Sequence, residues 1–311
     1  IDHVTKLSAG DFGYLTHKGS DNTSGRSTRS TTREASRRIN DLAFADDIAL
    51  LENDNERAQK QLDAHRHHAS TVGLEINIKK TEQLRLNHPD NTQPFPPLHI
   101  DGQPIAIVDE FKYLGSYMGS TDKDINHRIA MAWAAFEKLK KILASRTGEP
   151  TVKIKLRLFN AACISILLYG CETWTITAQQ SAKFDIFART CYRIMLGIRQ
   201  SETHTTNEQL YKLANARPVS DIIRERQLQF IGHCLRMPSE EPANIYALYT
   251  SQVAASHRRG RGNLSFLAQT SSYLCSDSRI KLTAAEIAAY AKDKSIWNKL
   301  VAEPPIRRPD R

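Results

Sequence analysis

Apolar residues follow different periods in the two halves of the chain. Before about residue 120 they form short runs that alternate with polar residues and are separated by turn-forming residues, whereas from Asp122 onward they recur at every third or fourth position. The first pattern is typical of β-strands and the second of amphipathic helices. The sequence therefore predicts an α+β protein in which a strand-containing region precedes a mostly helical one.

Two adjacent aspartates, Asp46 and Asp47, stand inside the apolar stretch 42–51. Because burial of neighbouring carboxylates is costly, we expect a tight β-hairpin with strands 42–44 and 48–51 and both aspartates at its turn. Carboxylate oxygens at the tip of a rigid hairpin suit a Mg²⁺ ion that bridges substrate phosphates. Aspartate also occupies turns for conformational reasons alone, so the pair by itself leaves both interpretations open.

A helix and several strands are expected between this hairpin and residue 120. Apolar positions at helical spacing predict a helix over 54–72, closed by Gly73. Its histidines at 65, 67 and 68 are interpreted as helix surface rather than a metal site, because residue 67 points away from the other two. One strand is expected to begin at residue 74, and further strands are expected over 84–86, 98–100, 103–108 and 111–117, with a turn at 101–102.

The rest of the chain is predicted to be helical. The first helix begins near Asp122 and carries an apolar stripe from Ile125 to Leu143, and Gly148 and Pro150 follow it. Thr283 and Glu286 form a capping box that starts the last helix, which reaches toward Trp297. The helices expected between these two cover 152–169, 178–196, 207–214, 219–236 and 244–249.

Charge and cysteine content narrow the class of protein. The 43 Lys and Arg residues against 34 Asp and Glu give a formal charge of +9, which fits a polyanionic partner. The five cysteines are odd in number and form no C-x-x-C pair, which favours reduced thiols in an intracellular protein, nuclear or cytoplasmic, rather than a secreted one. The longest apolar run, 161–169, is too short to span a bilayer, so no membrane association is expected.

Two basic clusters are candidates for phosphate contact. The first cluster occupies the first turns of the helix expected over 152–169 and consists of Lys153, Lys155 and Arg157. We predict that these first turns are exposed. The second cluster consists of Arg258, Arg259 and Arg261. Glycines lie within and directly after it, so we expect this segment to be a flexible loop suited to phosphate contact.

Four segments in one order resemble the reverse transcriptase of non-LTR (LINE-type) retrotransposons. Residues 44–47 match the F-A-D-D hairpin of that family, and 73–82 match its G-L-x-I-N-x-x-K-T-E segment. Residues 111–116 are similar to its F-K-Y-L-G segment, and 168–174 to the L-Y-G-C-E-T-W signature of its helical thumb. The resemblance runs from about residue 42 to residue 237.

The resemblance implies a role for each matching residue. Asp46 and Asp47 would be metal-binding carboxylates for two Mg²⁺ ions, and Lys80 the candidate general acid for the leaving pyrophosphate. The partners implied for the complete enzyme are an RNA template, a DNA primer, target DNA and dNTPs. The primer terminus would be held by Phe111, Lys112, Tyr113, Leu114 and Gly115.

Two elements of the family pattern are not recognisable in this sequence. The family has another catalytic aspartate and a glycine-containing nucleotide-binding segment upstream of the hairpin, and Asp41 is too close in sequence to approach the hairpin tip from a neighbouring strand. The chain opens with Ile1 and its first methionine is Met118, so we expect a C-terminal portion that does not polymerise alone. The expected regions are a truncated, flexible segment (1–40), the end of the palm (41–120), a helical thumb (121–200) and a helical C-terminal region (201–311).

The sequence also allows two other interpretations. The chain could be a repurposed thumb and tail that binds nucleic acid without chemistry, supported by its two basic clusters. It could also be an inert remnant, because an incomplete palm leaves sheet edges and apolar faces uncovered.

Overall fold

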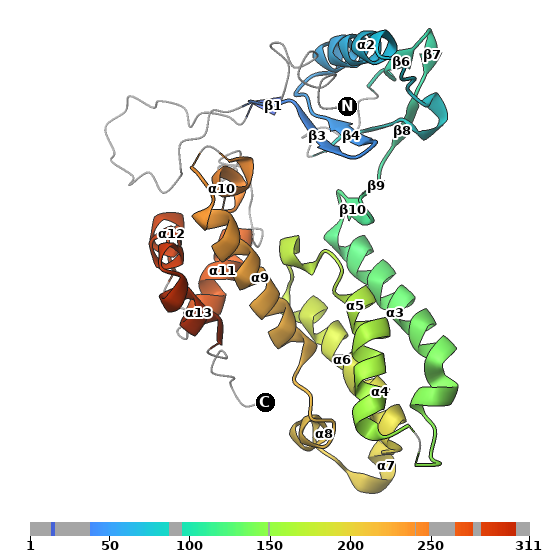
Figure 1. The fold of residues 1–311 in the computed structure, drawn as a ribbon, viewed down its shortest axis with the longest axis vertical. Coiled ribbons are helices and arrows are strands. Elements are labelled where there is room, and N and C mark those ends of the chain that lie inside the picture. The colour runs from blue at the N-terminus through green and yellow to red at the C-terminus, as the bar shows by residue number, and fades with distance from the viewer. Residues whose placement is uncertain are drawn as a thin grey trace. The chain divides into compact units, whose positions relative to one another are not determined.

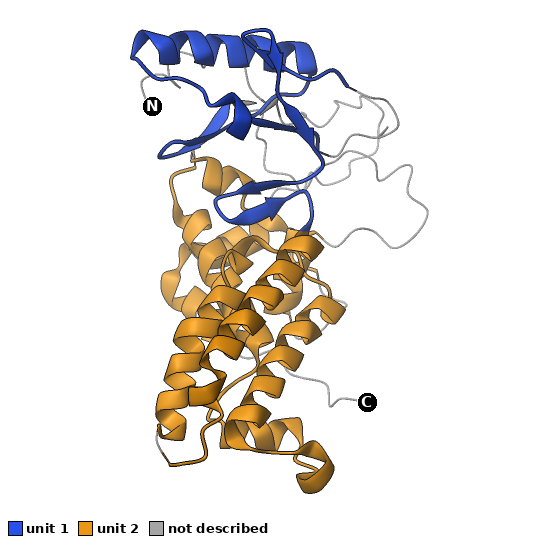
Figure 2. Cartoon of the chain, turned by 90° about the vertical axis from the view of Figure 1, so that its right-hand side faces the viewer, with its two compact units in different colours: residues 1–27, 34–120 blue, residues 28–33, 121–311 orange. Residues whose placement is uncertain are grey.

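The computed structural model describes residues 14–15, 38–86, 95–148, 150–239, 241–248, 265–275 and 281–302. The chain forms two compact units (Figure 2), one of residues 1–27 and 34–120 and the other of residues 28–33 and 121–311. We call them the strand unit and the helical unit. The small two-stranded sheets of the first and the helices of the second make an α+β fold, as the sequence predicts.

Within its described residues, the strand unit combines one long helix with five two-stranded sheets (Figure 1). Helix α2 (Asn55–Thr71) begins after its cap Asp54 and confirms the predicted helix. The small core beneath it contains Leu62, Leu98, Ile100 and Ile105. The strands are β1 (Tyr14–Leu15), β2 (Arg38–Ile39), β3 (Asp41–Phe44), β4 (Asp47–Leu50), β5 (Glu82–Leu84), β6 (His99–Ile100), β7 (Gln103–Pro104), β8 (Ala106–Val108), β9 (Phe111–Tyr113) and β10 (Ser116–Met118). Of the pairs that these described strands form, only β5 with β8 is parallel.

Two predicted strands of this unit are wrong. The segment 111–117 is a hairpin, β9 and β10, whose turn residues Leu114 and Gly115 have positive φ values of 47° and 86°, as a type I′ turn requires. The segment expected to start a strand at residue 74 instead leads into a short 3₁₀ helix, η1 (Ile78–Lys80). The Asn77 carboxamide accepts the Lys79 N–H at 3.1 Å, and this local hydrogen bond competes with strand pairing.

The helical unit confirms most of the predicted helices. Helix α9 has the predicted bounds, and α6 ends before Gly197, which adopts the left-handed conformation at φ 72°. The last predicted helix is two helices, because the Asp293 carboxylate accepts the N–H groups of Ser295 and Ile296 and starts a new one. The helical segments are α3 (Thr121–Leu143), α4 (Val152–Phe159), the π-helical turn η2 (Asn160–Ile164), α5 (Ser165–Leu167), the 3₁₀ turn η3 (Cys171–Thr173), α6 (Ala178–Leu196), α7 (Gln200–Thr203), α8 (Asn207–Leu213), α9 (Val219–Arg236), α10 (Pro242–Tyr246), α11 (Phe266–Leu274), α12 (Ala284–Lys292) and α13 (Lys294–Ala302).

Helix α9 belongs to both hydrophobic cores of the helical unit. Val219 and Ile223, near its start, lie in a core that α3, α4 and α6 also form. Leu228, Ile231 and Leu235, nearer its end, lie in a second core with α12 and α13. Figure 1 shows α9 running between these two groups of helices. The helix therefore joins the two halves of the unit.

Close packing between α9 and α13 requires a glycine. A Cβ atom on Gly232 would lie 2.2 Å from Nε1 of Trp297, whose side chain is 1% exposed. The same indole nitrogen donates a hydrogen bond to the Leu228 carbonyl at 2.9 Å. Any larger residue at position 232 must displace the indole.

The segment 168–174 is held by hydrogen bonds from distant residues. The Gln227 amide donates to the carbonyls of Cys171 at 2.6 Å and Trp174 at 2.8 Å. The Gln269 amide donates to the Trp174 carbonyl and to the Gln227 side chain, at 3.0 and 2.7 Å. The Trp174 indole donates to the Asp124 carboxylate at 2.9 Å. This buried network links α3, α9 and α11 through one short turn.

Charge is distributed unevenly between the two parts of the sequence. Residues 1–120 contain 14 Lys and Arg against 17 Asp and Glu, a formal charge of −3, whereas residues 121–311 contain 29 against 17, a charge of +12. The excess positive charge therefore lies wholly in the part of the sequence that forms the helical unit. None of the helices that the structure describes is both long and apolar enough for a membrane span.

Candidate metal-binding hairpin

The two candidate metal ligands stand at the tip of the predicted hairpin, which the structure confirms. Strands β3 and β4 pair in antiparallel register, with Phe44 opposite Asp47 and Asp41 opposite Leu50. The turn consists of Ala45 and Asp46 alone, so Asp47 begins the second strand rather than ending the turn. Both carboxylates belong to exposed residues.

Strand register sets which way Asp47 faces. Residues directly opposite each other in a pair of strands share a face, so Asp47 lies with Phe44 and on the face opposite that of Leu50. Leu50 packs against the core under α2, which makes the Asp47 face the outer one. The outer face is apolar around the carboxylate, with Phe44 63% and Leu42 44% exposed.

The backbone at the tip is held in an uncommon conformation. Ala45 has a φ of 52°, in the left-handed region that favours glycine. A side chain there costs about 1 kcal/mol, and such strain recurs at functional sites. The conformation determines where the next two residues, Asp46 and Asp47, project their carboxylates.

The β9–β10 hairpin contacts the β3–β4 hairpin through Tyr113. The Tyr113 hydroxyl donates a hydrogen bond to the Leu42 carbonyl on β3 at 3.0 Å, and its ring stacks with that of Phe111 at 6.4 Å between centroids. Burial raises the pKa of Tyr113, and the negative charges of Asp47 and Asp41 raise it further. The structure thus brings together two of the segments that the sequence singled out, although they are far apart in the chain.

The remaining residues of the predicted primer-holding segment lie in the β9–β10 hairpin and its turn. Lys112 is exposed and its ammonium lies 5.8 Å from the centre of the Tyr117 ring, a cation–π contact across the hairpin. Leu114 and Gly115 form the turn itself, and the Leu114 side chain is 38% exposed.

Lys80 is the last residue of η1 and is exposed. Among the contacts described for the strand unit, none joins its side chain to Asp46, Asp47 or Tyr113. Its role as a general acid therefore stays a prediction.

A third carboxylate does not join the pair within the part of the chain that the structure describes. Asp41 lies at the opposite end of β3, about 10 Å away along a strand that rises about 3.3 Å per residue. No group of three His, Cys, Asp or Glu side chains among the described residues could hold a metal ion. The hairpin offers two candidate ligands, and among the described residues no third one joins them.

The position of His65 differs from the one that the sequence predicts. Its expected place on the helix surface is wrong, because it is only 7% exposed on the inner face of α2. Burial lowers its pKa, whereas the nearby Asp41 carboxylate raises it; burial raises the pKa of Asp41 in turn. Its helical spacing with the buried Leu62 and Ala69 was the signal that could have placed it inside.

The basic cluster of α4 is only partly exposed. Lys153 and Arg157 are exposed, but Lys155 is 6% exposed and its ammonium donates to the Ser145 carbonyl. The prediction that Lys155 is exposed is therefore wrong, because positions 153 and 157 share one side of a helix and 155 faces the other. Arg258, Arg259 and Arg261 lie outside the described residues.

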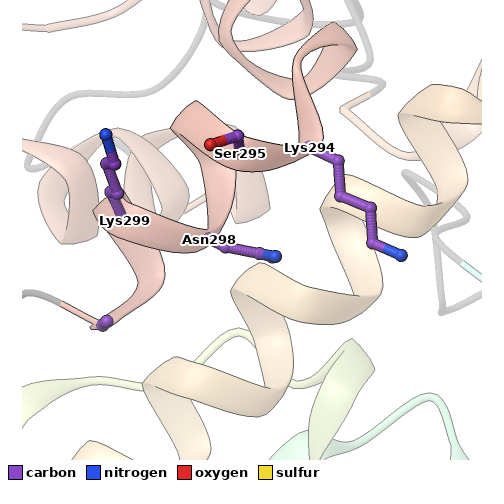
Figure 3. Close-up of a pocket in the computed structure, with 5 residues that line it drawn as sticks. Lys294, Ser295, Asn298 and Lys299 are labelled. Carbon is purple, nitrogen blue, oxygen red and sulfur yellow. The ribbon is translucent and has the colours of Figure 1, made fainter.

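A shallow hollow lies along α13 in the helical unit (Figure 3). Lys294, Ser295, Asn298 and Lys299 line it together with Ala302, and none of these side chains is an acid or a histidine. The lining therefore offers two amines, a hydroxyl and an amide but no carboxylate or imidazole.

The fold and the hairpin define an α+β protein that presents paired carboxylates on its strand unit and excess positive charge in its helical part. The chain is 31% identical over 206 residues to the putative uncharacterized transposon-derived protein F52C9.6 of Caenorhabditis elegans, a match that covers 64% of this chain and 73% of that protein. The chain belongs to the family of that transposon-derived protein. No family model and no solved structure matches it.

Proposed function

We propose that the chain derives from the reverse transcriptase of a non-LTR retrotransposon and that its β3–β4 hairpin carries two of the carboxylates for template-directed nucleotidyl transfer. The observation that carries the proposal is the Tyr113 hydrogen bond to Leu42, because it seats the proposed primer-holding hairpin beside the proposed metal-binding one. Transposon ancestry agrees with this assignment.

The paired aspartates fit a divalent cation as ligands. Asp46 and Asp47 are exposed, adjacent and held at a two-residue turn, and carboxylate oxygens are the ligands that Mg²⁺ prefers. In such enzymes two Mg²⁺ ions lower the barrier by activating the primer hydroxyl and stabilising the pyrophosphate leaving group. Two carboxylates do not hold two close cations without a third partner, so we propose that this chain alone does not polymerise.

The other residues have positioning roles in this proposal. The segment Phe111 to Gly115 holds the primer terminus, with Tyr113 fixing its distance from the hairpin and Lys112 near the phosphates. Lys80 donates a proton to the leaving pyrophosphate. The strand unit is the end of the palm (41–120), followed by a thumb (121–200) and a helical C-terminal region (201–311), and the partners are an RNA template, a DNA primer, target DNA and dNTPs.

Metal binding tests the hairpin assignment directly. In an NMR titration of the chain with Mn²⁺ as a paramagnetic probe, we expect selective broadening of amide signals from residues 44–48. Asp46→Asn combined with Asp47→Asn should abolish it. Asp109→Asn, which removes another exposed carboxylate of the same unit, should leave it intact. Equal broadening in all three proteins would overturn the assignment.

Primer extension tests the inactivity of the isolated chain. With Mg²⁺, dNTPs and a templated primer, incorporation should not exceed that of an Asp46→Ala control. Incorporation well above the control would show that the third carboxylate is not required or is supplied by this chain.

A second candidate function is nucleic-acid binding without chemistry. The +12 charge after residue 120 and the exposed Lys153 and Arg157 favour it. In filter binding against salt concentration, Lys153→Ala with Arg157→Ala should weaken binding and make the log–log salt slope shallower by about 2, about 1 for each phosphate that is no longer neutralised. Lys212→Ala is the matched control, because that exposed lysine already pairs with Glu208 at 2.8 Å. A binding constant that does not change with salt would exclude phosphate contact.

A further inference from the structure

In the segment 168–174, packing in the hydrophobic core does not account for the aromatic residue Tyr169. Leu168, Cys171 and Trp174 are buried and form part of the core of the helical unit. Tyr169, in the same turn, is 50% exposed. Its neighbours are fixed by the network around Gln227, so the turn holds the tyrosine at the surface.

A buried arginine holds the ring of Tyr169 in place. The Arg128 guanidinium carbon lies 4.3 Å from the ring centre, within the range of a cation–π contact, although Arg128 is only 6% exposed. Arg128 Nε lies 3.8 Å from the Asp124 carboxylate, which also accepts the Trp174 indole N–H. The tyrosine is therefore a surface ring on a rigid support.

Helix α9 places a second arginine beside this turn and carries an exposed aromatic ring one helical turn further along. Arg226 Nη1 lies 3.4 Å from the Leu168 carbonyl, the residue before Tyr169, and 3.7 Å from the Glu172 carboxylate. Because that ion pair is long and partly exposed, a phosphate can compete for the guanidinium at little cost. Phe230 follows Arg226 by one helical turn on the same side of α9, about 6 Å along, and is 38% exposed.

Exposed aromatic rings next to arginines are the chemistry that binds unpaired bases. Each base presents a π-face that stacks on an aromatic ring, while guanidinium groups contact the phosphates. The formal charge of +12 after residue 120 favours a polyanion as the occupant.

We propose that Tyr169 and Phe230, with Arg226 beside them, form a stacking platform for the bases of single-stranded nucleic acid. The platform belongs to the helical unit and needs no catalysis by the hairpin. A negative result in the Mn²⁺ titration, or unexpected primer extension, would therefore not contradict the stacking platform. Conversely, the absence of base stacking would not contradict the assignment of the hairpin.

Anisotropy with the full chain separates stacking from phosphate attraction. The probes are a labelled oligouridylate and an abasic oligonucleotide of the same length. The wild type should bind the oligouridylate about tenfold more tightly, and Tyr169→Ala should remove most of that difference without changing abasic binding. Tyr169→Phe should retain it, because phenylalanine also stacks. Tyr290→Ala, which removes a 45%-exposed tyrosine of the same unit, is the matched control.

Two results would overturn the proposal. One is equal affinity of the wild type for the two probes. The other is a Tyr169→Ala protein that binds oligouridylate as well as the Tyr290→Ala protein. If Tyr169→Ala unfolds, photo-cross-linking of the unaltered chain to 5-iodouridine-substituted RNA decides: adducts at Tyr169 or Phe230 support the platform, and adducts only elsewhere, or none, exclude it.

Discussion

The strand unit and the helical unit differ in the size of their hydrophobic cores. In the helical unit several large aromatic side chains are fully buried, among them Phe136, Phe159, Phe184 and Trp297. In the described part of the strand unit a core of four buried residues supports the β3–β4 hairpin, whose outer face leaves Phe44 63% exposed. A two-stranded sheet cannot bury both of its faces and is marginally stable alone. Stability and candidate chemistry therefore reside in different units.

The largest effect is expected where the helical unit is packed most tightly. Gly232→Ala places a methyl group against the Trp297 indole and breaks its hydrogen bond to Leu228. We expect a loss of about 3 kcal/mol in the free energy of unfolding, from overpacking and the broken hydrogen bond. Urea unfolding followed by circular dichroism measures it. His233→Ala, at an exposed position of the same helix, should change stability by less than about 0.5 kcal/mol.

Removal of the network under the 168–174 turn should have the next largest effect. Gln227→Leu removes the side-chain donor to the Cys171 carbonyl and one of the two side-chain donors to the Trp174 carbonyl in a buried site. We expect a loss of about 2 kcal/mol in the same unfolding experiment. The exposed Gln229→Leu is the control. If both variants unfold at the same urea concentration, the network does not stabilise the unit.

Acid should weaken the strand unit through His65. Burial lowers the pKa of His65 in the folded state below its ordinary value of 6.5. As pH falls below 6.5, the unfolded chain therefore binds a proton before the folded chain does. The stability that is present above pH 6.5 is lost as pH falls toward the lower pKa of the folded state. The slope is at most about 1.4 kcal/mol per pH unit for one proton. The Asp41 carboxylate and His68 also act on this imidazole, with opposite effects on its pKa.

Amide hydrogen exchange of the hairpin between pH 7.5 and 5.5 measures this loss. His65→Gln should flatten the pH dependence, whereas His67→Gln, at an exposed position of the same helix, should not. A dependence that persists in His65→Gln would assign it to another group.

The smallest effect is expected at the hairpin tip. Ala45→Gly relieves the positive φ but gives the unfolded chain more freedom, so we expect a net stabilisation of about 0.5 kcal/mol. Hydrogen exchange of the β3–β4 amides measures it. Ala43→Gly, two residues away in the paired strand, should destabilise instead. Destabilisation by both glycines would show that Ala45 carries no strain.

Local signals in the sequence predicted much of the fold and some of the site. The bounds of α9, the end of α6 before Gly197 and the capping box at Thr283 all follow from contacts within a few residues. The β3–β4 hairpin follows in the same way from one short stretch. The break at Asp293 and the turn at Leu114 were missed, because the same apolar period continues through both.

The sequence by itself determined most of the helices, the β3–β4 hairpin and the resemblance of its motifs to a retrotransposon enzyme. Only the tertiary structure decided which side chains are available for function. It buried Lys155 and His65, exposed Tyr169 and placed Tyr113 against Leu42, 71 residues earlier in the chain. The physical reason is that local propensity depends on neighbours in sequence, whereas burial and hydrogen bonding depend on partners that only folding brings near.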